Sequence, residues 1–142
     1  MGISLDQNII MQMEEHATST FPDECCGFMF GGNDNGNIKV ELISEVINTH
    51  PDLKGRRFLI SPDDYMNAEN YADENGFTLV GVYHSHPNHP AIPSEIDRLA
   101  ALPGFSYIIF SIMDGKPTDV TAWELAEDRS EFRAVQIKKE KG

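Results

Sequence analysis

Residues 77–86, FTLVGVYHSH, form a nearly continuous apolar run that ends in two histidines. A short run of this kind predicts a buried strand near the centre of a sheet. Side chains alternate between the two faces of a strand, so we expect His84 and His86 to project to one face, about 7 Å apart along the strand, and Ser85 to project to the other.

Helical and strand patterns alternate on both sides of this run. A capping box at Ser4 opens a first helix, which Pro22 closes, and the Ser61-Pro62 pair is typical of a second helix start. The expected helices cover residues 4–21, 61–75 and 94–102. The expected strands are 25–31, 38–47, 58–60, 77–86, 105–112, 120–125 and 132–137. The pattern predicts a single α/β domain with a mixed central β-sheet flanked by helices.

Length and charge narrow the class of protein. The 142 residues fit one domain, and no apolar run is long enough to span a bilayer. The formal net charge of −12 disfavours nucleic acid and anionic membrane surfaces as partners. The N-terminus lacks a basic region followed by an apolar stretch, so we expect no secretory signal and a cytoplasmic location. The sequence leaves the oligomeric state open.

The two cysteines, Cys25 and Cys26, are adjacent. Adjacent cysteines cannot link distant segments, and their spacing excludes a zinc ribbon and a thioredoxin-type site. A thiol hydrolase that pairs one of them with a histidine is an alternative. Their place in an apolar strand favours small buried side chains instead.

The two histidines have the spacing of a metal site. Neutral imidazole is the commonest protein ligand for zinc, and two imidazoles on one strand face suit one tetrahedral ion. Asp97 is a candidate third ligand, because it lies in the first turn of the helix that Ser94 opens, where the helix dipole favours an ionised carboxylate. The same spacing is that of a capping box, so it also has a purely structural interpretation. His89, in the intervening loop, is a spare candidate, although exposure to solvent is the simpler interpretation.

Together these residues resemble the motif of the JAMM (MPN+) metalloprotease family. The matching positions are Glu24 within residues 22–28 (PDECCGF), His84-x-His86, and Ser94-x-x-Asp97 after seven further residues. The resemblance covers about residues 5–125 and implies the MPN architecture, which is similar to that of cytidine deaminases. It implies a JAMM/MPN+ domain at residues 1–137, followed by a basic tail at 138–142 that we expect to be disordered.

The resemblance also implies a role for each of these residues. His84, His86 and Asp97 would bind one Zn²⁺ per chain. Glu24 would be the catalytic acid/base group, and Ser94 would donate a hydrogen bond to the developing oxyanion. The reaction implied is hydrolysis of a peptide or isopeptide bond.

The short connection after the motif bears on the substrate. Only residues 98–104 separate Asp97 from the next expected strand. The chain is therefore similar to the compact bacterial and archaeal members of the family, which are associated with ubiquitin-like sulfur carriers of the ThiS/MoaD type. The resemblance implies cleavage after the C-terminal Gly-Gly of such a carrier, and the loop at 50–57 is a candidate contact for its tail.

Three alternatives differ in function class. A zinc peptidase acting on small peptides would use the same residues. A noncatalytic, metal-bearing MPN interaction module is disfavoured by the intact Glu24, since inactive relatives typically lose motif residues. A zinc deaminase is excluded because its signature requires HxE and PCxxC, whereas this chain has His84-x-His86 and two adjacent cysteines.

Overall fold

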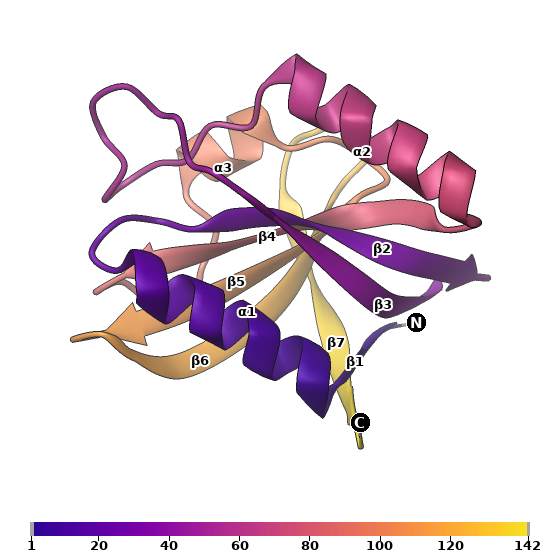
Figure 1. Cartoon of the computed structure of the whole chain (residues 1–142), viewed down its shortest axis with the longest axis horizontal. Helices are drawn as coiled ribbons and strands as arrows, with labels where there is room; N and C mark the ends of the chain where they lie inside the picture. The colour runs from indigo at the N-terminus through magenta and orange to yellow at the C-terminus, as the bar shows by residue number, and fades with distance from the viewer. Residues whose placement is uncertain (1, 142) are drawn as a thin grey trace.

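The protein is described by a computed structural model that covers residues 2–141. Within that range the chain forms seven strands and three helices in a single α/β domain (Figure 1). In chain order these are β1 Gly2–Asp6, α1 Gln7–Thr20, β2 Cys26–Asp34, β3 Asn37–Val46, α2 Pro62–Asn75, β4 Thr78–Pro87, α3 Glu95–Ala100, β5 Ser106–Met113, β6 Lys116–Leu125 and β7 Phe132–Glu140. None of the helices among these residues is long and apolar enough to cross a membrane.

The sheet is mixed and closes on itself. Its strand order is β1-β3-β2-β4-β5-β6-β7, and β1 pairs with both β3 and β7. The pairs β1–β3, β1–β7 and β4–β5 are parallel, whereas the other four are antiparallel. The predicted mixed sheet flanked by helices is confirmed: α1 lies on one side, and α2 and α3 lie on the other (Figure 1).

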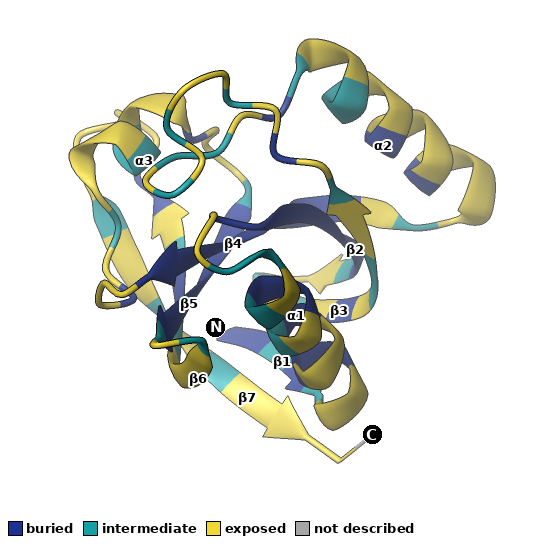
Figure 2. Cartoon of the chain, turned by 60° about the vertical axis from the view of Figure 1, so that its left-hand side comes forward, coloured by how far each residue is buried: buried dark blue, intermediate teal, exposed yellow. Residues whose placement is uncertain are grey.

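Strand β4 is buried from Leu79 to Pro87, as its apolar sequence predicts (Figure 2). A β-bulge interrupts its pairing with β2, because Phe30 pairs with Leu79 and Met29 pairs with Gly81, which leaves Val80 without a partner. One extra residue shifts the alternation of side chains along the strand. Val80 and Tyr83 consequently belong to one core, and Leu79 and Val82 to the other.

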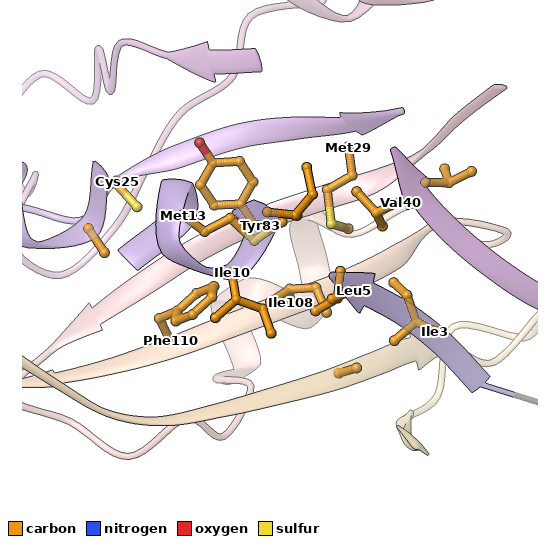
Figure 3. Close-up of a cluster of buried hydrophobic side chains, with 14 of the residues drawn as sticks. Ile3, Leu5, Ile10, Met13, Cys25, Met29, Val40, Tyr83, Ile108 and Phe110 are labelled. Carbon is orange, nitrogen blue, oxygen red and sulfur yellow. The ribbon is translucent and has the colours of Figure 1, made fainter. Parts of the chain in front are cut away.

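Two hydrophobic cores hold these layers together. The first packs α1 against the sheet through residues such as Ile10, Met13 and Tyr83 (Figure 3). The second packs α2 against the opposite face through Ala68, Ala72 and the surrounding aromatic residues. Burial of apolar surface is the main favourable term in folding, so β4, which contributes to both cores, is held in place from two sides.

The start of the chain differs from the sequence prediction. Residues 2–6 are a strand, and α1 begins after Asp6, whose carboxylate accepts a hydrogen bond from the Ile9 backbone N–H at 2.8 Å. Ser4 is therefore not the helix cap. The strand forms because Ile3 and Leu5 are fully buried and pair with distant strands, which a five-residue alternation does not reveal.

The expected disordered tail also differs from the structure. Residues 138–140 continue β7, and Lys138 and Lys139 pair with Ser4 and Leu5 of β1. Backbone hydrogen bonding to β1 orders these residues although their side chains are polar. Residue 142 lies outside the described residues. The short strand expected at 58–60 is instead irregular, although the helix predicted at 61–75 is confirmed with its capping Ser61.

Candidate metal centre

Three side chains from β4 and α3 converge at one end of the sheet. The Nε2 atoms of His84 and His86 lie 3.1 Å apart. The Oδ2 atom of Asp97 lies 3.2 Å from Nε2 of His86 and 3.5 Å from Nε2 of His84. One donor atom from each residue lies within 4.8 Å of the other two, and no other such group of His, Cys, Asp or Glu occurs in residues 2–141.

Local structure fixes each of these groups. Alternation along β4 places the two imidazoles on one face, while Ser85 accepts a hydrogen bond from the Cys25 backbone N–H at 2.8 Å. Ser94 caps α3, and its hydroxyl accepts a hydrogen bond from the Asp97 N–H at 3.0 Å. In return, Oδ2 of Asp97 accepts a hydrogen bond from the Ser94 N–H at 2.9 Å, which completes the predicted capping box.

The donor set fits a zinc ion. Nδ1 of His86 lies 2.8 Å from the Pro90 carbonyl oxygen, so an N–H at this position leaves Nε2 as a lone pair facing Asp97. The buried Nδ1 of His84 has no hydrogen-bond partner. Two imidazole nitrogens and a carboxylate oxygen are ligands that Zn²⁺ accepts, and a fourth position would remain for water.

The pKa values of the clustered side chains bear on how readily they bind a cation. Burial lowers the pKa of His84, which keeps its imidazole neutral. Burial opposes ionisation of Asp97, but the positive charge and the hydrogen bonds that the two imidazoles offer when they carry a proton on Nε2, together with the Ser94 N–H, hold the pKa of this carboxyl below its usual range. Burial opposes protonation of His86, but its contacts with Asp97 raise its pKa in the metal-free protein, so a cation that binds there would displace that proton.

Glu24 lines a cleft together with His86 of this cluster. The residue lies two positions before β2 and is only 4% exposed. Its Oε1 atom is buried without a hydrogen-bond partner. Burial raises the pKa of this carboxyl to about 8, an effect that nearby His86 partly offsets. A cleft of about 410 Å³ is lined by Glu24, His86 and Ser94, together with groups from the loop that follows β3.

The remaining histidines and cysteines take no part in the cluster. The Nδ1 of His16 contacts the Tyr83 hydroxyl at 2.8 Å, and the Nδ1 of His50 accepts a hydrogen bond from a loop N–H. His89 lines the cleft but lies outside the group of three. Burial raises the pKa values of Cys25 and Cys26 to about 12, which disfavours the thiol-hydrolase alternative.

Sequence reasoning missed Asn48, a buried amide two residues after the end of β3. Its Nδ2 donates hydrogen bonds to the carbonyl oxygens of Glu24 at 3.0 Å and Arg57 at 2.9 Å. Its Oδ1 accepts hydrogen bonds from the N–H groups of His50 and Leu59. Asn48 therefore ties the loop at 48–59 to the backbone of Glu24. The only signal in the sequence is an amide directly after an apolar strand, and it does not identify these partners.

Comparison with known families identifies a match over most of the chain. Residues 6–126 match the model of the family described as prokaryotic homologs of the JAB domain. The matched range contains the three clustered side chains, Glu24 and Ser94.

Individual relatives and solved structures agree with this match. A desampylase of Haloferax volcanii is 29% identical over 92% of this chain and 88% of its own length. A desampylase of Pyrococcus furiosus is 30% identical over 80% of this chain and 74% of its own length. A solution structure of a Salinibacter ruber protein is 41% identical and covers 99% of this chain and 92% of its own, with a TM-score of 0.74. A JAB1/MPN domain protein of Archaeoglobus fulgidus, 19% identical over 99% of this chain and 97% of its own with a TM-score of 0.58, shares the fold.

Proposed function

The chain belongs to the family of prokaryotic homologs of the JAB domain, and from this premise we propose that it is a zinc-dependent isopeptidase. In this proposal it hydrolyses the peptide or isopeptide bond after the C-terminal Gly-Gly of a ubiquitin-like sulfur carrier of the ThiS/MoaD type. The names of its desampylase relatives support a hydrolase that removes a conjugated protein. We further propose that it acts in the cytoplasm.

One observation carries the proposal. His84, His86 and Asp97 gather their donor atoms within 4.8 Å, and the unpartnered carboxyl of Glu24 lines the cleft beside them. Buried polar groups without partners are rare in folded proteins and call for an explanation. A metal-bound water at this position would supply a partner for Oε1 of Glu24.

The proposed mechanism assigns each residue a physical task. His84, His86 and Asp97 would hold Zn²⁺, which when bound supplies a water of lowered pKa and a Lewis acid for the scissile carbonyl. Ionised Glu24 would take a proton from the water and deliver it to the leaving amine, because a carboxyl whose pKa is raised to about 8 is a stronger base than an ordinary glutamate and can hold the proton until the amine departs. The Ser94 hydroxyl accepts from the Asp97 N–H, so its own hydrogen remains free for the oxyanion.

The test combines metal content with cleavage of a ThiS/MoaD-type carrier extended beyond Gly-Gly. We expect about one zinc per chain, and Glu24→Gln should lower kcat by about 10²–10⁴-fold without loss of zinc, since Glu24 is not a ligand. Asp23→Asn is the matched control, because Asp23 is the exposed neighbour of Glu24. Loss of zinc in Glu24→Gln would contradict the assigned role.

Other outcomes would select the alternatives. Zinc binding without cleavage of the carrier, but with cleavage of short peptides, would indicate a peptidase of different specificity. Zinc binding without hydrolysis of either substrate would favour a noncatalytic interaction module.

A further inference from the structure

The cleft beside Glu24 has a cationic wall. Arg56 and Arg57, from the loop between β3 and α2, line it together with His89, whereas Glu24 is the only carboxylate among its lining residues. The chain as a whole carries 23 acidic residues against 11 lysines and arginines. Two adjacent guanidinium groups in the cleft of so acidic a protein therefore point to an anionic ligand.

No carboxylate among the residues that the structure describes neutralises the two arginines. Across residues 2–141, neither Arg56 nor Arg57 forms an ion pair. Neither arginine forms an ion pair with Glu24 in this part of the chain. Their donors remain available to a group that enters from outside.

The arginine loop is anchored on the Glu24 side of the cleft. The Glu24 backbone N–H donates to the Lys54 carbonyl oxygen at 2.6 Å, and the N–H groups of Arg56 and Arg57 both donate to the Leu53 carbonyl oxygen. The Asn48 amide joins the Glu24 and Arg57 carbonyl oxygens. In Figures 1 and 2 this loop lies beside α3, and Ser94 and Ile96 line the cleft opposite it.

The position of the arginine loop beside Glu24 indicates which part of the substrate would contact Arg56 and Arg57. In hydrolysis the C–N bond breaks, the water oxygen joins the carbonyl carbon, and the amine departs with the proton that Glu24 delivers. The departing amine must therefore lie next to Glu24. The rest of the leaving group must then lie near the arginine loop, which is hydrogen-bonded to the backbone of Glu24. An amino acid released from the end of a chain carries an α-carboxylate one carbon from that amine, whereas the ε-amine of a lysine in an isopeptide carries only methylenes there.

We propose that Arg56 and Arg57 form a subsite for the α-carboxylate of the leaving group. The preferred substrate is accordingly a carrier whose Gly-Gly is followed by a single C-terminal amino acid in peptide linkage. This inference depends on the proposed function and narrows its substrate class. Arginine suits the task because its planar donors match a carboxylate, and charge-assisted hydrogen bonds of this kind are stronger than neutral ones.

The experiment compares two substrates that differ in one group. A ThiS/MoaD-type carrier is extended by one alanine after Gly-Gly and ends either in a free carboxylate or in a carboxamide. For the wild-type protein we expect kcat/KM to be about 10- to 100-fold higher for the carboxylate. In the double variant Arg56→Gln, Arg57→Gln this preference should fall to near unity, with the carboxamide cleaved at close to the wild-type rate. Arg133→Gln, on exposed β7, is the matched control and should keep the preference.

Several results would overturn the subsite. One is equal cleavage of the two substrates by the wild type. Another is a double variant that still prefers the carboxylate substrate. A third is a double variant in which kcat/KM falls equally for both substrates, because the arginines would then contact the carrier itself. A carrier joined to a lysine side chain that is cleaved faster than the carboxylate substrate would also contradict the proposal.

A binding measurement separates this inference from the proposed function. The Kd values of the two extended carriers are measured with Glu24→Gln, which should bind without turnover. Tighter binding of the carboxylate form, lost in the triple variant with both arginines replaced, would support the subsite even if no cleavage were observed with any protein. Equal Kd values would refute it, whereas a failure of cleavage alone would count only against the isopeptidase.

Discussion

The two faces of β4 differ in how their polar groups are satisfied. On the α1 side, Tyr83 is fully buried and its hydroxyl contacts Nδ1 of His16 at 2.8 Å, and Ser85 accepts a backbone hydrogen bond from Cys25. On the opposite side, Nδ1 of His84 and Oε1 of Glu24 are buried without partners. The first face is complete within the chain, whereas the second requires something that the chain does not supply.

The comparison separates residues that stabilise the fold from residues that prepare the site. A polar group buried with its partner contributes to stability or costs little. A polar group buried without one lowers stability, and proteins tolerate that cost mainly where a ligand or a reaction uses the group. Changes on the α1 face should therefore alter folding, and changes on the other face should alter metal binding and pH dependence.

The largest effect is expected from Asp97→Asn. The amide can still accept the Ser94 N–H hydrogen bond, so α3 should keep its cap, but a neutral oxygen is a poor zinc ligand. We expect zinc affinity to fall by more than about tenfold and hydrolysis to be lost, with an unchanged far-ultraviolet circular dichroism spectrum. Glu95→Gln, an exposed position on the same helix, is the control. Retention of wild-type zinc affinity by Asp97→Asn would remove this residue from the ligand set.

The second effect concerns the pH dependence of stability in the metal-free protein. Burial raises the pKa of Glu24 from 4.5 to about 8, so the folded state binds this proton more tightly than the unfolded state does. The free energy of unfolding should therefore decrease as pH rises from about 4.5 to 8. Glu24→Gln cannot ionise, so relative to the wild type it should gain stability across that range, reaching about 4–5 kcal/mol at pH 8.5.

Urea unfolding in the presence of a chelator measures this difference at pH 5 and pH 8.5. Asp23→Asn serves again as the control, because its exposed side chain should leave the profile unchanged. If the difference between Glu24→Gln and the wild type were the same at both pH values, Glu24 would not be buried as a neutral acid.

A smaller effect is expected on the α1 face, from Gly27→Ala. Gly27 of β2 pairs with Tyr83, and a Cβ atom there would clash with the Tyr83 ring. The ring is fully buried and cannot move away, so we expect a loss of about 1–3 kcal/mol in the free energy of unfolding. Zinc content per folded chain should not change.

The same strand offers a matched control for this substitution. Gly32→Ala places a Cβ where no other atom lies within 4 Å, so its stability should remain close to that of the wild type. If Gly27→Ala were as stable as Gly32→Ala, the close packing of Tyr83 against β2 would be disproved.

The sequence predicts the parts of the fold and the site that depend on local pattern. The shared face of His84 and His86 follows from strand alternation, and the Ser94–Asp97 capping box follows from its spacing. Both properties are set by residues a few positions apart, so they can be read without knowledge of the tertiary structure.

The parts that were missed depend on contacts between distant residues. Strand β1 exists because Ile3 and Leu5 are buried against β3 and β7, and the same pairing orders Lys138 and Lys139. The role of Asn48 depends on carbonyl oxygens 24 and 9 residues away in the chain. Nothing in the local composition of these segments encodes their partners, because tertiary context overrides intrinsic preference there.

The bulge at Val80 has a consequence for how this family of sequences can change in length. Because Leu79 and Gly81 already pair with the consecutive residues Phe30 and Met29, removing Val80 would restore a regular ladder and leave every later residue of β4 opposite its present partner. Removing Tyr83 instead, with the pairing upstream kept, would turn both imidazoles toward α1, because side chains alternate with a period of two. Val80 is thus the place where β4 can lose a residue without moving the candidate metal centre to the other side of the sheet.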